Sequence, residues 1–274
     1  MRPAVTLIFL LALLGALAAC RSDANDIIQE AEANWRKGDY FAAIRLNYQR
    51  VARDPHGKDG AQALLRIGNI YYWNLRQISD AVGVYQQVAA DYPGSIEEYQ
   101  ARLLLAEIYA SEIGDLTQAI AEYDKVLHMP AAENRAEIQF RRAEAYFKKE
   151  DFNRALRELQ QIQEAGVGGH LADQVQRKIG NIYQIQKRYE EALAAFQKGA
   201  RSSCVECRRR AILNLMDTYE SLFDFENAIA SVRRLGTSPE DMARIKQEVA
   251  RLEDKRRRLG RAADAVADPR GPKQ

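Results

Sequence analysis

Two short stretches decide the fold of this chain: Arg66–Tyr71 reads RIGNIY, and Lys178–Tyr183 reads KIGNIY, 112 residues further along. Near-identity at that distance is either a coincidence or the sign of a shorter internal period. Three periods of about 37 residues make up the distance, and a period in that range is typical of repeat proteins. We therefore expect further copies of the same unit along the chain.

A second motif recurs with this period: a large apolar residue, two variable residues, alanine and another apolar residue. Its copies read YFAAI, ISDAV, LTQAI, FNRAL, YEEAL and FENAI, and successive alanines are 38, 38, 36, 37 and 36 residues apart. A small residue followed three positions later by tyrosine precedes most copies. The alanines are Ala43, Ala81, Ala119, Ala155, Ala192 and Ala228, and the preceding pairs are Gly68/Tyr71, Ala106/Tyr109, Ala143/Tyr146, Gly180/Tyr183 and, with a larger first member, Met216/Tyr219.

Each unit is predicted to form two amphipathic helices, A and B. In the fifth unit we expect helix A over Ala172–Gln186 and helix B over Tyr189–Ala200. Only two residues separate them, so the helices must turn back antiparallel. The small residue of helix A and the alanine of helix B let the two backbones approach closely, and the tyrosine fills the space beside that contact.

These motifs resemble the tetratricopeptide repeat over residues 24–236. The resemblance implies an all-α fold, a right-handed α-solenoid of about six helix hairpins. Three features depart from the family pattern: the period is 36–38 residues instead of 34, the consensus tryptophan of helix A is absent, and a closing proline follows helix B only in the first three units (Pro55, Pro93 and Pro130).

The sequence also predicts how the solenoid ends. Ser238 and Pro239 are typical of a helix start, and Met242, Ile245, Val249 and Leu252 follow at helical spacing. We expect a capping helix within residues 237–260, because a solenoid must cover its last open face. Residues 261–274 are expected to be a flexible tail.

The N-terminal segment has the character of an export signal. Arg2 precedes an uncharged apolar run from Ala4 to Ala19, which is shorter than the roughly 20 residues of a membrane span. Leu17–Cys20 (LAAC) resembles a bacterial lipobox, which implies removal of residues 1–19 and acylation of Cys20, with residues 20–23 as a lipidated tether. An ordinary signal peptide that happens to contain a cysteine is the alternative.

The position after the lipidated cysteine bears on localisation. By analogy with lipoprotein sorting, Arg21 in place of aspartate implies the bacterial outer membrane, with the protein facing the periplasm. We therefore expect contact with the membrane through the lipid anchor.

Composition and motifs exclude several function classes. The net charge of +2 creates no strong field, so nucleic acid is not an expected partner. No catalytic or nucleotide-binding motif is present, and we expect neither an enzyme nor a cofactor. The basic run Lys255–Arg258 is interpreted as a solvated helix end, with contact to anionic lipid or an acidic partner as the alternative.

Two cysteines remain besides Cys20. Cys204 and Cys207 form a CxxC, which could be a local disulfide, a pair of free thiols, or a metal or redox site. Zinc would need two further ligands. The three histidines (His56, His128 and His170) fall in three other turns and are expected to be too dispersed to converge on the CxxC, so we expect no metal site. Export favours the structural disulfide.

The working surface is predicted from the family geometry, which places helix A on the inner face of the solenoid. Residues six before, two before and one after the helix-A tyrosine are then expected to line a protein-binding groove, with amides, acids and aromatic anchors suited to a peptide. The residues so predicted are Leu65, Asn69, Tyr72, Glu107, Phe140, Glu144, Phe147, Arg177, Asn181, Gln184 and Asp217. For Tyr72, Phe140 and Phe147 a core position is an equal alternative.

Together these features indicate a lipid-anchored scaffold or adaptor that binds envelope proteins or peptides. The chain loosely resembles repeat lipoproteins of the β-barrel assembly machinery and envelope-division coordinators, through DYPGS (Asp91–Ser95) and the helix after it. A pilotin-like role for a secretin or pilus system is one alternative. A carrier for a lipid or glycan is another, of a different class.

Overall fold

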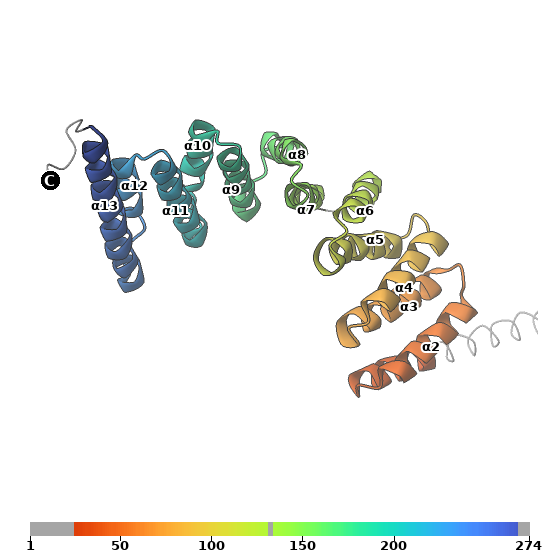
Figure 1. Cartoon of the computed structure of the whole chain (residues 1–274). Helices are drawn as coiled ribbons and strands as arrows, with labels where there is room; N and C mark the ends of the chain where they lie inside the picture. The colour runs from red at the N-terminus through yellow and green to blue at the C-terminus, as the bar shows by residue number, and fades with distance from the viewer. Residues whose placement is uncertain (1–24, 131–133, 268–274) are drawn as a thin grey trace, which may run out of the picture. The chain divides into compact units, whose positions relative to one another are not determined.

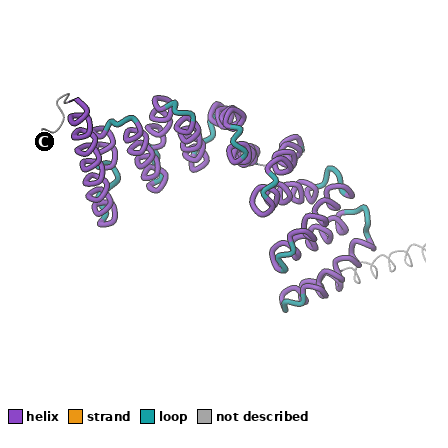
Figure 2. The backbone as a smooth tube through the Cα atoms, viewed as in Figure 1, coloured by secondary structure: helices purple, strands orange, loops and turns teal. Residues whose placement is uncertain are grey.

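The structure is a computed structural model that describes residues 25–130 and 134–267, with side chains to residue 261 (Figure 1). The expected signal peptide, Cys20 with its tether, and residues 268–274 lie outside the described residues. Within the described ranges every element of secondary structure is a helix (Figure 2). The expected fold class, an all-α solenoid of helix hairpins with a final capping helix, is confirmed.

Helices A and B alternate along the chain. Helix A of the successive hairpins comprises residues 25–36, α3 (Lys58–Asn69), α5 (Ile96–Ile108), α7 (Arg135–Lys148), α9 (Gly169–Ile185) and α11 (Val205–Ser221). Helix B comprises α2 (Tyr40–Arg53), α4 (Ile78–Asp91), α6 (Leu116–His128), α8 (Phe152–Glu164), α10 (Tyr189–Gly199) and α12 (Phe225–Val232), and α13 (Pro239–Ala267) follows. The chain divides into two compact units, Met1–Ile138 and Gln139–Gln274, and the division falls inside α7.

The six repeated alanines occupy the same place in every hairpin. Each is the fourth residue of its helix B, and each is fully buried. Four residues further on, α4 and α10 each place a large buried aromatic side chain against helix A, Tyr85 and Phe196 respectively. The ring of Tyr85 lies over Gly68 and the ring of Phe196 over Gly180, where a Cβ atom would come within 2.6 and 2.4 Å of ring carbons. The small residues of RIGNIY and KIGNIY are therefore required by the packing of the hairpin.

The turns between helices A and B share one backbone feature in all six hairpins. The residue two positions before helix B is left-handed, with φ between 56° and 82°. Aspartate follows it in four hairpins, and its carboxylate accepts a backbone N–H of the first turn of helix B. The left-handed residues are Gly38, Arg76, Gly114, Glu150, Lys187 and Phe223.

The second and third hairpins absorb an additional residue in a π-helical turn. Their helix-A tyrosines, Tyr71 and Tyr109, stand seven residues before helix B, whereas Tyr146 stands six residues before it. The extra residue widens the end of helix A into η1 (Ile70–Asn74) and η2 (Tyr109–Ile113), as single insertions in helices do. The two longest distances between successive repeat alanines, 38 residues each, end in these two hairpins.

The capping helix α13 is longer than expected. Its first turn is capped by Ser238, whose Oγ accepts the N–H of Asp241 at 3.1 Å, and residues 261–267 of the expected tail continue the helix. Leu252 is fully buried and packs with Ile245 and Val249 against α11 and α12. Met242, in contrast, is mostly exposed and does not belong to the buried face.

None of the described helices combines the length and the apolar character needed to cross a membrane.

Candidate functional site

Of the predicted groove residues in the compact unit Met1–Ile138, Leu65 and Tyr72 are buried, and Asn69 and Glu107 are half-buried. The assignment of Leu65 and Tyr72 to an open groove is therefore wrong, and both belong to the core around Ile67 and Tyr85. Asn69 is half-buried, and its Oδ1 accepts the hydroxyl hydrogen of Tyr85 at 2.8 Å. This hydrogen bond fixes the orientation of the Asn69 amide at the contact between α3 and α4.

At the end of α3 and in η1, aromatic and charged side chains that were not among the predicted site residues make contacts with one another. The guanidinium of Arg66 lies 4.6 Å from the centre of the Trp35 ring, and Trp35 Nε1 donates to Asn74 Oδ1 at 3.0 Å. Trp73 stacks edge-on against Tyr72 and remains mostly exposed. Trp73 and Asn74 belong to η1. The one sign of this π-helical turn in the sequence was the length of the repeat, which is 38 residues between Ala43 and Ala81.

In the second compact unit, Gln139–Gln274, a lysine of α9 contacts two of the predicted residues of α7. Glu144 Oε1 lies 2.9 Å from Lys178 Nζ, and the same ammonium lies 4.7 Å from the centre of the Phe147 ring. Phe147 is half-buried, whereas Phe140 is buried in the core, which corrects its assignment to the groove. Lys178 was not predicted as a site residue, although it opens the KIGNIY stretch.

The remaining predicted residues lie on α9 and α11, which contact each other. Arg177, Asn181 and Gln184 are half-buried, and Asp217 is exposed. Asn181 Oδ1 accepts from Asn214 Nδ2 at 3.4 Å, which joins the two helices. Loss of hydration beside the protein surface raises the pKa of Asp217 above its ordinary value, and the nearby Glu220 carboxylate raises it further.

Glu220 connects α11 to the capping helix. Its carboxylate accepts two hydrogen bonds from Arg251, at 2.8 and 2.6 Å, and one from Lys255 at 2.6 Å. The hydrogen bond from Arg251 is the main reason that the pKa of Glu220 is lowered to about 2. In the basic run Lys255–Arg258, Lys255 pairs with Glu220 and Arg256 with Glu226, so part of this run serves to attach α13.

This ion pair predicts an acid-sensitive contact. The pKa of Glu220 is lower in the folded chain than the 4.5 of a free side chain, so its contribution to stability is present above about pH 4.5 and is lost as the pH falls towards 2. The basic partners are partly exposed, and we expect about 1–2 kcal/mol after screening.

The pH dependence of urea unfolding checks this contribution. Glu220→Gln should lower stability at pH 7 and flatten the loss between pH 5 and pH 2. Glu240→Gln, an exposed carboxylate on α13, is the matched control and should retain the wild-type profile. An unchanged acid profile in Glu220→Gln would contradict the assignment.

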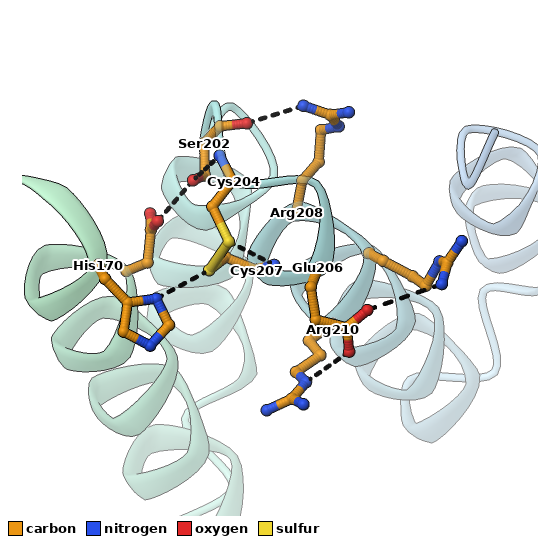
Figure 3. The surroundings of a disulfide bond; sticks show 9 residues. His170, Ser202, Cys204, Glu206, Cys207, Arg208 and Arg210 are labelled. Atoms are coloured by element: carbon orange, nitrogen blue, oxygen red, sulfur yellow. Dashed lines mark hydrogen bonds and ion pairs between the residues drawn. A yellow bond between two sulfur atoms is a disulfide. The ribbon is translucent and has the colours of Figure 1, made fainter.

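The two cysteines lie at the beginning of α11, next to the beginning of α9 (Figure 3). Their sulfurs are bonded to each other, with the two Cα atoms 5.2 Å apart. Cys207 Sγ lies 3.4 Å from His170 Nδ1, so the expectation that the histidines are too dispersed to reach the CxxC is wrong for His170. The antiparallel hairpin of α9 and α10 returns the chain to the same end, which residue spacing alone did not reveal.

The hairpins and their packing agree with the comparison to known families. The model of the tetratricopeptide repeat-like domain matches residues 72–215. This chain belongs to that family. The match begins after α3 and ends inside α11, so it covers α4 and the hairpins α5/α6, α7/α8 and α9/α10 of this tetratricopeptide-repeat protein.

Solved structures share the fold at low sequence identity. A tetratricopeptide repeat protein from Parabacteroides merdae has 15% identity and a TM-score of 0.53, covering 85% of this chain and 99% of that one. PilW, described as a widely conserved type IV pilus biogenesis factor, has 18% identity and a TM-score of 0.52, covering 77% and 91%. YrrB, described as having an unusual peptide-binding site, has 15% identity and a TM-score of 0.52, covering 69% and 90%. No curated protein matches the chain significantly.

Proposed function

We propose that this tetratricopeptide-repeat protein is a lipid-anchored scaffold of the bacterial envelope that binds segments of partner proteins along its A helices. The observation that carries the proposal is the polar character of the surface on α9 and α11. Arg177, Asn181 and Gln184 are half-buried at matched helical positions on α9, and Asp217 is exposed on α11. These side chains offer a cation, two amides and a carboxylate.

The arrangement suits an extended peptide for two reasons. Amide side chains can pair with both the N–H and the C=O groups of a peptide backbone, whereas Arg177 and Asp217 can select charged side chains. The hydrogen bond from Asn214 holds the Asn181 amide in place before a ligand arrives, which reduces the entropy lost on binding. The peptide-binding site named for YrrB supports this proposal by analogy of fold.

Anchoring belongs to the same proposal and rests on the sequence. Cys20 follows an apolar segment in a lipobox-like context, and several acyl chains together hold a protein firmly where one does not. Arg21 supports the outer membrane as the location. The partner is then an envelope protein, and assembly of outer-membrane proteins or envelope division are the processes that the DYPGS-containing repeat lipoproteins suggest.

Site-specific photocrosslinking in cells tests the binding surface. A photoreactive residue at Asn181 or Gln184 should crosslink to a discrete envelope protein, because both side chains reach the surface of α9. Gln197, exposed on helix B of the same hairpin, is the control and should give no such product. The same crosslinks from Gln197 but none from Asn181 would overturn the assignment of this face.

The nature of the captured molecule separates the alternatives. An assembly-machinery or division protein supports the scaffold, and a secretin or pilus protein supports the pilotin-like role, for which the fold similarity to PilW is the specific observation. A co-purified lipid or glycan without protein would favour a carrier. Cys20→Ser should move the chain from the membrane to the soluble fraction; unchanged membrane retention would contradict the anchor.

A further inference from the structure

Three potential metal ligands converge where α9 and α11 begin. The ligand atoms of His170, Cys204 and Cys207 all lie within 4.8 Å of one another. Figure 3 shows the His170 ring directed at the sulfur of Cys207, at 3.4 Å from its Nδ1. The group adjoins a pocket of about 200 Å³, which is lined by His170, Cys207, Asp173, Arg177, Glu206 and Arg210, among others.

We propose that this corner is a redox-gated site for a soft divalent cation of the Zn²⁺ type. In the oxidised chain the two sulfurs are bonded to each other and offer no thiolate. When a dithiol reductant supplies two electrons and two protons, the disulfide becomes two thiols and the reductant becomes a disulfide. The cation then binds both sulfurs and His170, and two thiol protons are released to solvent.

The distances suit this chemistry. Zn–S bonds of about 2.3 Å and Zn–N bonds of about 2.0–2.1 Å at a tetrahedral angle place sulfur and nitrogen about 3.6 Å apart. The observed separation of 3.4 Å between Cys207 and His170 is close to that value. Once the disulfide is broken, side-chain rotation can move the two sulfurs to the roughly 3.8 Å that the same geometry requires.

A helix N-terminus and a positive charge lie beside the two sulfurs. Cys204 is the N-cap residue of α11, and its sulfur accepts the N–H of Cys207 at 3.2 Å. A helix N-terminus and a nearby guanidinium group both stabilise a metal-bound thiolate, and Arg177 lines the adjoining pocket.

The neighbouring acids have partners inside the protein. Asp173 accepts from the Ser202 hydroxyl at 2.5 Å, and Glu206 pairs with Arg210 at 2.9 Å. His170 is exposed, so a cation can enter from solvent and water can complete the fourth position. Binding would join the beginnings of α9 and α11. Reduction followed by metal binding would therefore replace the Cys204–Cys207 disulfide, which is local to the start of α11, by a link between two hairpins.

Cobalt titration of the full chain tests the proposal. Cys20→Ser in every sample leaves Cys204 and Cys207 as the only thiols, and Co²⁺ is the spectroscopic probe for Zn²⁺. After reduction with a phosphine and its removal without air, we expect one equivalent of Co²⁺ to give thiolate charge-transfer and tetrahedral d–d bands, which Zn²⁺ then displaces. The oxidised chain should give neither band.

Two variants identify the ligands. His170→Ala should weaken Co²⁺ binding about tenfold or more, and His128→Ala, which removes an exposed histidine on α6, should leave the affinity unchanged. Circular dichroism confirms that each variant is folded. The proposal is overturned if reduced and oxidised chains bind Co²⁺ equally, if no charge-transfer band appears, or if His170→Ala binds as tightly as the parent chain.

Discussion

Gly180→Leu is expected to destabilise the second unit by about 3 kcal/mol or more, because the new side chain has no space. Even its first carbon would come within 2.4 Å of the Phe196 ring, and Phe196 is itself buried against the core of α10 and α11. Urea unfolding followed by circular dichroism measures the loss. At a scale of about 2–4 °C per kcal/mol, the thermal midpoint should fall by about 6 °C or more.

A matched substitution separates packing from helix propensity. Gly260→Leu also replaces a helical glycine, but no atom lies within 4 Å of the position its Cβ would take. We expect it to be neutral or to stabilise α13, because leucine favours helix over glycine by a fraction of 1 kcal/mol.

A double-mutant cycle tests the specific contact. Phe196→Ala alone should cost about 3–5 kcal/mol, but combined with Gly180→Leu it frees the space that the leucine needs. The double variant should therefore be more stable than the sum of the single losses predicts, by about 1–3 kcal/mol. Strict additivity would show that Gly180 and Phe196 do not meet.

Leu252→Ala is expected to cost about 2–5 kcal/mol, because it removes a fully buried side chain through which α13 covers the last hairpin. Leu252 packs with the core that contains Leu215 and Val232. A cavity there cannot be filled by solvent without wetting that core. Urea unfolding and amide hydrogen exchange in α12 and α13 measure the effect.

The same helix contains the control. Leu259 is 40% exposed, against 0% for Leu252, so Leu259→Ala should change stability by no more than about 0.5 kcal/mol. Equal, small effects for the two leucines would mean that α13 does not cover the last hairpin in solution. A loss confined to Leu252→Ala supports the cap.

The repeat made most of the fold predictable. The alanine motif located the first residue of every B helix, because each copy begins where its helix begins. The glycines of RIGNIY and KIGNIY indicated where two helices approach most closely. Such signals are strong because a one-residue shift would place a larger side chain in a contact that has room only for hydrogen or methyl.

The candidate site was less predictable. Family geometry placed Tyr72 and Phe140 in the groove, yet both side chains are buried, as large aromatic side chains often are. Trp35 Nε1 donates to Asn74 Oδ1, and Asn74 lies in the π-helical turn η1, which was not among the predicted elements. The contact of Lys178 with both Glu144 and Phe147 likewise depends on the packing of α9 beside α7.

By itself the sequence determined the repeat, the hairpins and the positions of their buried alanines, since these depend on helical periodicity and on side-chain size within one hairpin. Only the tertiary structure decided which residues of different hairpins meet. His170 and Cys207 are separated by 37 residues and lie in contact. They meet because α10 runs antiparallel to α9 and returns the chain to the end at which α9 began. Contacts between hairpins depend on how helices pack, and no local pattern in the chain records that.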